Sequence, residues 1–224
     1  MSANYSDMRV KMVDGQIRTT DVTNSAILLA MGTVPREAFV DASLRDLAYI
    51  DVDLEIAPAE GGRPARFLME PSPFAKLLQL AEIQPGDRVL DVGCGTGYSS
   101  AVLSSLGGSV VALESDSTLA GRAAQLVADL GFDNVTVVTG SLAQGVAANG
   151  PYDVIVVGGA VDEIPQALFD QLKERGRLVA VEGHGNAGVA RLYLKDNGLV
   201  TGRRAFNAAV KPLPGFERIK AFEF

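Results

Sequence analysis

The feature that most constrains the fold is residues 89–98, VLDVGCGTGY, where a short apolar run enters a turn containing three glycines. Gly93, Gly95 and Gly97 let the backbone turn tightly and let a ligand approach where a Cβ atom would collide. Glycines at such a turn also suit a purely structural role. The spacing G-x-G-x-G differs from the G-x-G-x-x-G of dinucleotide sites, which argues against a nicotinamide or flavin nucleotide.

Strand-like and helix-like patterns alternate through the middle of the chain. Short continuous apolar runs such as VIVV are typical of strands covered on both faces, as in a parallel sheet wrapped by helices. The predicted strands are 88–92, 110–113, 135–138, 153–157 and 178–181, and the predicted helices are 74–81, 98–106, 119–130 and 165–173.

The end of the chain has a different pattern. Segments 191–195 and 199–206 flank Asp196, Asn197 and Gly198, which predicts a β-hairpin, and 217–224 alternates like a last strand. We therefore expect an α/β, Rossmann-like fold, with a mostly parallel seven-stranded sheet and antiparallel strands at the C-terminal end.

The first 73 residues are organised differently. Apolar spacing predicts one helix around Met8 and Met12 and a second around Leu28 and Met31, which ends before Pro35. Segment 57–73 is rich in proline and glycine, which predicts a loop that serves as a linker or a lid. We expect 1–73 to form a helical extension with a substrate-side loop, and 74–224 to form the cofactor-binding domain.

Composition excludes several classes of function. A net charge of −7 and a pI near 4.8 argue against nucleic acid as a partner, because no Lys/Arg cluster is present to neutralise phosphates. No apolar run reaches the ~20 residues of a membrane span, so we expect a cytoplasmic protein. A single cysteine, Cys94, and a single histidine, His184, supply no disulfide and no metal-ligand cluster.

Further polar groups follow the next two predicted strands. Glu114 ends a strand, where a carboxylate can accept hydrogen bonds from both ribose hydroxyls of a nucleoside, although it also suits an ordinary solvated strand end. Ser141 follows the third strand and can hold an adenine amino group, or be a plain turn serine. The predicted cofactor-binding residues are Asp91, Gly93, Gly95, Thr96, Gly97, Glu114, Ser115, Ser141 and Leu142.

The chain resembles the protein-L-isoaspartate O-methyltransferase family over nearly its whole length. The combination of several separated motifs is more specific than the glycine-rich turn, which many methyltransferases share. These motifs are Ala30-Met31, Val34-Pro35-Arg36, Phe39-Val40 and Ala48-Tyr49, then VLDVGCGTGYSSAVLSSLG, PYDVIVVGGAVDEIPQALFDQLKERGRLV with its Glu163-Ile164-Pro165 segment, and PLPGFE. The resemblance implies S-adenosylmethionine as cofactor, methyl transfer to a carboxylate, and protein repair, with a protein or peptide, or a small molecule, as substrate.

One loop departs from the family. The family carries Gly-Gln-Thr-Ile-Ser-x-Pro beside the substrate carboxylate, and the matching stretch here is 65–71, ARFLMEP. The glutamine position is Arg66, the threonine position is Phe67 and the active-site serine position is Met69, whereas Pro71 is kept. Neither Phe nor Met donates a hydrogen bond to a carboxylate. The departure predicts weak activity on isoaspartyl peptides.

The chemistry expected of this chain needs few catalytic groups. A carboxylate is ionised at neutral pH and attacks a methyl group without a general base. Arg66, Ser72 and His184 are substrate-side candidates, although a solvated loop histidine is the commoner case. Two alternatives stay open: a methyltransferase of the same ancestry with another acceptor, and a protein that binds S-adenosylmethionine without turnover.

Overall fold

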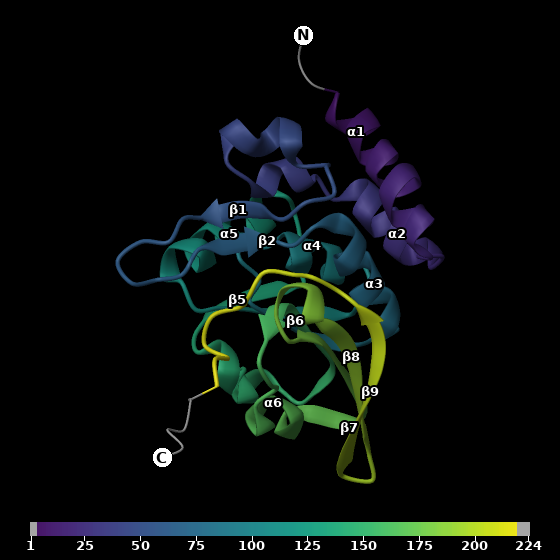
Figure 1. Cartoon of the computed structure of the whole chain (residues 1–224), viewed down its shortest axis with the longest axis vertical. Coiled ribbons are helices and arrows are strands. Elements are labelled where there is room, and N and C mark those ends of the chain that lie inside the picture. The colour runs from purple at the N-terminus through teal and green to yellow at the C-terminus, as the bar shows by residue number, and fades with distance from the viewer. Residues whose placement is uncertain (1–3, 219–224) are drawn as a thin grey trace.

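The computed structural model describes residues 4–218 (Figure 1). It centres on a seven-stranded sheet in the order β5-β4-β3-β6-β7-β8-β9. Strands β3 to β7 of this sheet are parallel, and the last two, β8 and β9, continue it as an antiparallel meander. The strands are β3 (Arg88–Val92), β4 (Ser109–Glu114), β5 (Val135–Thr139), β6 (Tyr152–Val161), β7 (Leu172–Glu182), β8 (Val189–Asp196) and β9 (Leu199–Asn207). The predicted α/β fold with a mostly parallel seven-stranded sheet is confirmed.

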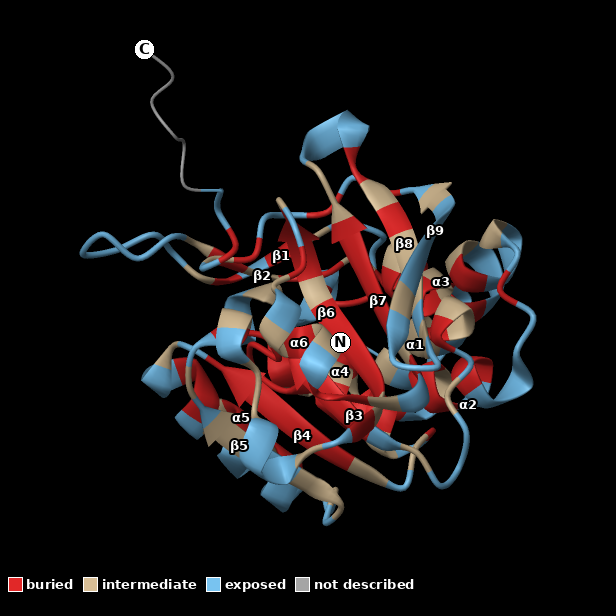
Figure 2. Ribbon diagram, turned by 90° about the horizontal axis from the view of Figure 1, so that it is seen from below, coloured by how far each residue is buried: buried red, intermediate tan, exposed pale blue. Residues whose placement is uncertain are grey.

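Alternation of side chains along the strands divides the core into two layers. Val89 and Val110 pack on one face of the sheet, and Leu90 and Val111 pack on the other. The central strands are buried on both faces, as Figure 2 shows, which explains their continuous apolar sequence. The first face is covered by α3 (Pro71–Ala81), α4 (Tyr98–Ser104) and α5 (Ser117–Asp129), and the second by α6 (Gln166–Asp170) and the segment after β9.

The two predicted N-terminal helices are present as α1 (Tyr5–Met12) and α2 (Ser25–Thr33). The α1 helix continues through a π turn and a 3₁₀ turn to Thr20, and the Asn24 side chain caps α2 by accepting hydrogen bonds from two backbone N–H groups. Their buried residues join the same apolar cluster as α3 and α4. No helix within residues 4–218 is long and apolar enough to cross a membrane.

The expectation of a loop over 57–73 was wrong at both of its ends. β1 (Leu54–Ala57) pairs antiparallel with β2 (Arg66–Leu68), and only 58–65 between them has loop character. Pro71 and Pro73 lie in the first turn of α3, where a missing N–H costs no helical hydrogen bond. Prolines were therefore mistaken for loop signals where they start a helix.

Two other expectations need correction near the C-terminal end. The helix predicted over 165–173 ends at Asp170, because Leu172 already pairs with Tyr152 as the start of β7. The predicted hairpin over 191–206 is present as β8 and β9 and turns at Asn197 and Gly198, both with positive φ. Glu217 and Arg218 are not in a strand, and the rest of the strand predicted over 217–224 lies outside the described residues.

A buried arginine connects the N-terminal extension to the sheet domain. Arg36 is fully buried; its Nε donates to the carbonyl of Ala48 at 2.7 Å and its Nη2 to the carbonyl of Met69 at 2.8 Å. Its guanidinium lies 4.8 Å from the ring centroid of Tyr98, the first residue of α4. One side chain therefore fixes the extension, the segment before α3 and the start of α4.

We expect Arg36→Leu to lower the free energy of unfolding by about 2–4 kcal/mol, because two buried carbonyls lose their donors. Urea unfolding followed by circular dichroism measures this. The matched control is Arg45→Leu, since Arg45 is exposed in the neighbouring 3₁₀ turn and its loss should change stability by about 0.5 kcal/mol or less. Equal effects of both substitutions would contradict the role given to Arg36.

Candidate functional site

The glycine-rich turn lies at the carboxyl edge of the sheet, directly after β3. Gly93, Gly95 and Gly97 all have positive φ, a conformation that side chains disfavour. A Cβ atom at Gly93 would lie 2.6 Å from the Leu213 side chain, and one at Gly95 would lie 2.6 Å from Cδ1 of Ile56. The turn therefore needs glycine for two reasons: its φ angles are positive, and the side chains of Leu213 and Ile56 leave no space for a Cβ atom.

Asp91 offers a buried carboxylate below this turn. Its Oδ2 accepts hydrogen bonds from the hydroxyls of Ser99 and Ser100, both at 2.6 Å, while Oδ1 has no partner among the described residues. Burial raises the pKa of Asp91 to about 6, although the two serine hydroxyls oppose this. Asp91 lines a cavity that also borders Gly93 and Gly158. An unpaired carboxylate oxygen at such a cavity suits a cationic group, such as the ammonium of an amino acid.

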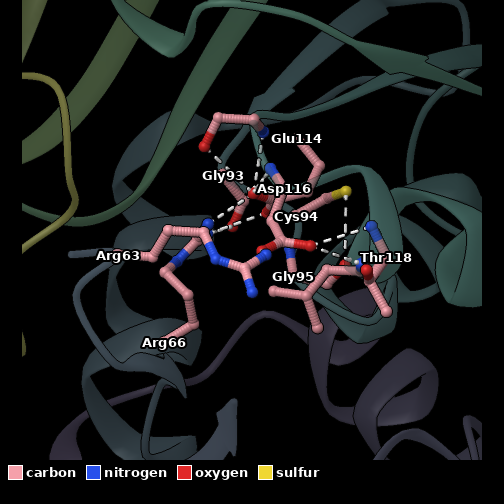
Figure 3. Close-up of polar contacts among 10 residues, drawn as sticks. Arg63, Arg66, Gly93, Cys94, Gly95, Glu114, Asp116 and Thr118 are labelled. Carbon is pink, nitrogen blue, oxygen red and sulfur yellow. Dashed lines mark hydrogen bonds and ion pairs between the residues drawn. The ribbon is translucent and has the colours of Figure 1, made fainter. Parts of the chain in front are cut away.

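Glu114 ends β4 beside the turn and is fully buried. Its carboxylate accepts backbone hydrogen bonds from Gly95 at 2.8 Å, Ser115 at 2.7 Å and Asp116 at 3.0 Å. Arg66 of β2 also pairs with both carboxylate oxygens, with Nη2 at 2.8 Å from Oε2 (Figure 3). The backbone amides fix the carboxylate in place, and Arg66 takes up its remaining hydrogen-bonding capacity. A ribose diol can bind Glu114 only if Arg66 moves.

The hairpin that carries Arg66 covers this edge of the sheet. Arg63 in the connecting loop pairs with Asp116 at 2.8 Å, so two arginines of one hairpin bind acidic groups after β4 (Figure 3). The Arg63 pair is exposed, whereas the Arg66 pair is buried. Removing one partner of a buried ion pair costs several kcal/mol of stability, roughly 3–5, whereas removing one partner of an exposed pair costs about 1 or less. Arg66 is therefore the stronger attachment of the hairpin.

The other predicted cofactor residues lie at the same edge with different surroundings. Thr96 is buried and donates to the carbonyl of Phe39 at 2.6 Å, so its hydroxyl ties the turn to the N-terminal extension. Ser115 is exposed next to Glu114. The backbone N–H of Gly140 donates to the carbonyl of Glu114 at 2.9 Å, which brings the exposed Ser141 and the buried Leu142 alongside. The contacts of these residues with a cofactor stay predictions, and the Thr96 hydroxyl is already bonded within the protein.

A second cavity adjoins the first. Both cavities are lined by Phe67, Met69 and Gly158, which therefore stand between them. Met69 is buried, and its carbonyl is held by Arg36. Because the two cavities share a wall, a group bound in the second can approach a group bound in the first. This arrangement is what a transfer reaction needs.

The three substrate-side candidates lie in different places. Arg66 lines the second cavity but is paired with Glu114. Ser72 lies in the first turn of α3, where its hydroxyl donates to Asp51 at 2.6 Å, and it lines neither of these cavities. His184 is exposed and pairs with Asp162 away from both. The structure brings only Arg66 to the acceptor side.

Sequence reasoning missed two groups at the second cavity, Asp53 and Lys211. The Asp53 carboxylate accepts from the backbone N–H of Glu70 at 3.0 Å. Burial, then Asp53 and Asp51, raise the pKa of Glu70 to about 7. The only sequence signal for the acidic residues at this cavity is the pattern Asp51-x-Asp53 before a strand. Lys211 had none, because it reaches the cavity only through the path of the chain after β9.

The fold and the site define the class: an enzyme that binds S-adenosylmethionine on a Rossmann-like domain and transfers its methyl group. The glycine turn, the orphaned oxygen of Asp91 and the buried acid at the end of β4 fit that cofactor, and the adjoining cavity is open to an acceptor on the other side of the shared wall. Among residues 4–218, no group of His, Cys, Asp or Glu side chains is arranged to hold a metal ion.

Comparison with known proteins names the family. The model of the protein-L-isoaspartate(D-aspartate) O-methyltransferase family matches residues 8–215, and this chain belongs to that family. The protein-L-isoaspartate O-methyltransferase of Koribacter versatilis is 36% identical over 92% of this chain and 90% of its own length. That of Methanoculleus marisnigri is 39% identical over 78% of this chain and 77% of its own.

Solved structures agree with this assignment. A protein-L-isoaspartate O-methyltransferase with 29% identity superposes with a TM-score of 0.80 over 93% of this chain and 67% of its own. A Plasmodium falciparum beta-aspartate methyltransferase in complex with S-adenosyl-L-homocysteine has a TM-score of 0.76 and 21% identity over 96% of this chain and all of its own, which shows the shared fold. The chain is therefore a member of a family of S-adenosylmethionine-dependent O-methyltransferases.

Asp91→Asn should stabilise the free protein and weaken cofactor binding. The folded-state pKa of Asp91 is raised, so folding favours its protonated form, and stability is lost as pH rises through about 6. The variant should therefore gain up to about 3 kcal/mol at pH 7.5, with a smaller gain below pH 5. Denaturant unfolding at the two pH values measures this. Affinity for S-adenosylhomocysteine should fall roughly tenfold to hundredfold; a gain that is equal at both pH values would contradict the cause given.

Arg66→Met should strengthen the binding of S-adenosylhomocysteine, roughly tenfold, because the ribose no longer competes with a guanidinium for Glu114. Isothermal titration calorimetry measures the affinity. Arg63→Met is the matched control on the same hairpin, and its exposed pair should leave affinity within about threefold. Weaker binding in Arg66→Met would show instead that Arg66 stays at Glu114 in the complex.

Proposed function

We propose that this chain methylates the free α-carboxylate of isoaspartyl residues in proteins or peptides, and so acts in protein repair. The observation that carries the proposal is the match to the family over residues 8–215. This range contains Phe67, Met69 and Gly158, which line both cavities. Relatives with this printed activity align over 90% and 77% of their own length. The acceptor would occupy the cavity beyond Phe67 and Met69.

The chemistry places modest demands on the protein. The bound cofactor supplies a methyl group activated by its sulfonium. A carboxylate oxygen forms a bond to that methyl carbon while the carbon–sulfur bond breaks, which leaves a neutral ester and a neutral thioether. No proton moves, so no general base is needed. Alignment of the two groups and exclusion of water can supply ~7 kcal/mol or more of the rate enhancement.

Each part of the site has a task in this scheme. Asp91 would hold the amino group of the cofactor, and the amino-acid portion of the cofactor would lie along the main chain of the glycine turn. Glu114 would hold the ribose after Arg66 leaves. Phe67 and Met69 form an apolar wall in place of the family's two hydroxyls, and this wall excludes water without orienting a carboxylate.

The deciding assay uses S-adenosylmethionine with a radiolabelled methyl group. We expect slow, base-labile labelling of an isoaspartyl peptide and none of the same peptide with an ordinary aspartate. Label on a different carboxylate acceptor would support the alternative favoured by Phe67 and Met69, namely a methyltransferase with another substrate. Firm cofactor binding without label on any carboxylate would favour a protein that binds S-adenosylmethionine without turnover.

Met69→Ser should raise kcat/KM for the isoaspartyl peptide about tenfold to hundredfold, because it restores a donor to the acceptor carboxylate. Met69→Ala is the matched control, since it opens the same space without a hydroxyl. Steady-state kinetics of all three proteins separates the two effects. An equal gain in Met69→Ala would show that space, and not the missing hydroxyl, limits the reaction.

A further inference from the structure

The segment after β9 returns across the sheet to the end of β6. The N–H of Ala160 donates to the carbonyl of Lys211 at 2.9 Å, and the N–H of Leu213 donates to the carbonyl of Ala160 at 2.8 Å. A Cβ atom at Gly159 would lie 3.0 Å from the Lys211 carbonyl oxygen and 2.9 Å from Cβ of Leu213. Gly159 therefore lets this segment lie directly on β6, and two backbone hydrogen bonds hold Lys211 at the carboxyl edge.

The Lys211 side chain points along the wall of the second cavity. Its ammonium lies 5.3 Å from the ring centroid of Phe67, and the residue lines the cavity together with Met69 and Gly158. In the part of the chain that the structure describes, no carboxylate lies within ion-pair distance of this ammonium. Phe67 thus positions a cation at the acceptor cavity that is committed to no ion pair.

The charges around this cavity give Lys211 a specific task. Asp53 lines the same cavity, and Asp51 and Glu70 lie near it. Without a cation these acids would repel an anionic substrate. The other cation at the cavity, Arg66, is paired with the buried Glu114 in the free protein and must leave that pair before it can bind an anion. Lys211 is the cation that a carboxylate can meet at this cavity without an ion pair first being broken.

We propose that Lys211 binds the acceptor carboxylate, with its ammonium stacked on Phe67, and so replaces the hydroxyls that Phe67 and Met69 cannot supply. This inference rests on the proposed function for the identity of the acceptor. The carboxylate loses its negative charge as the oxygen–methyl bond forms and the carbon–sulfur bond breaks. Lys211 therefore stabilises the bound substrate more than the transition state, and its removal acts on KM more than on kcat.

The test measures binding, so that it does not depend on turnover. Calorimetry on the enzyme bound to S-adenosylhomocysteine compares an isoaspartyl peptide with its neutral carboxamide analogue, in wild type, Lys211→Met and Lys211→Arg. The matched control is Lys76→Met, because Lys76 stacks on Phe206 at 4.5 Å in a different part of the molecule. Methionine retains the volume and the apolar stem of lysine, so folding is expected to be preserved.

We expect wild type and Lys76→Met to bind the isoaspartyl peptide tenfold to hundredfold more tightly than the carboxamide, a preference that disappears in Lys211→Met and returns in part in Lys211→Arg. Where wild type turns over, KM for the isoaspartyl peptide should rise by a similar factor in Lys211→Met. A preference that persists in Lys211→Met, or wild type that binds both peptides equally or neither, overturns the role of Lys211. Absence of turnover with the preference intact overturns the proposed function and leaves Lys211 as the carboxylate-binding residue.

Discussion

The buried carboxylate of Glu114 is the group on which the arrangement of the site depends. It lies without solvent contact at the end of β4, and an isolated charge there would be strongly unfavourable. Backbone N–H groups from the glycine turn and from the start of the next loop point at it, so both chain segments are oriented by one side chain. Arg66 completes the neutralisation and thereby attaches the β1–β2 hairpin to the sheet edge. The carboxylate thus organises the turn, the loop and the hairpin together.

Much of the fold could be predicted because its signals are local. The apolar runs of β3 and β4, the glycine turn and the Asn197-Gly198 hairpin each follow from a few adjacent residues. The expectation of a loop over 57–73 failed because proline starts a helix as readily as it marks a loop, and because β2 is only three residues long. A strand of that length has no period that a sequence can display.

The site could be predicted only for residues that lie in the glycine-rich motif or at the end of a strand. Glu114 was predicted from its place at a strand end and Asp91 from the glycine-rich motif, but the partner of Glu114 was not predicted, since Arg66 comes from a segment 48 residues away. Lys211 was missed for the same reason: its place depends on how the chain crosses β6 after the hairpin, and on the absence of a side chain at Gly159. Arg36 belongs to a family motif that is visible in the sequence. Its hydrogen bonds to the carbonyls of Ala48 and Met69 can be seen only in the tertiary structure.

The charges buried in the site indicate how binding and stability are linked. Asp91 has one unpartnered oxygen and a raised pKa, so the free protein holds a carboxylate whose environment disfavours its charge. A cationic group bound there removes that penalty, and the gain appears as affinity. Under the proposed role of Glu114, the Arg66–Glu114 ion pair has the opposite effect, because it must open before a ribose can take its place. Relief of the Asp91 penalty would then raise the affinity for the cofactor, and the cost of opening the Arg66–Glu114 pair would lower it.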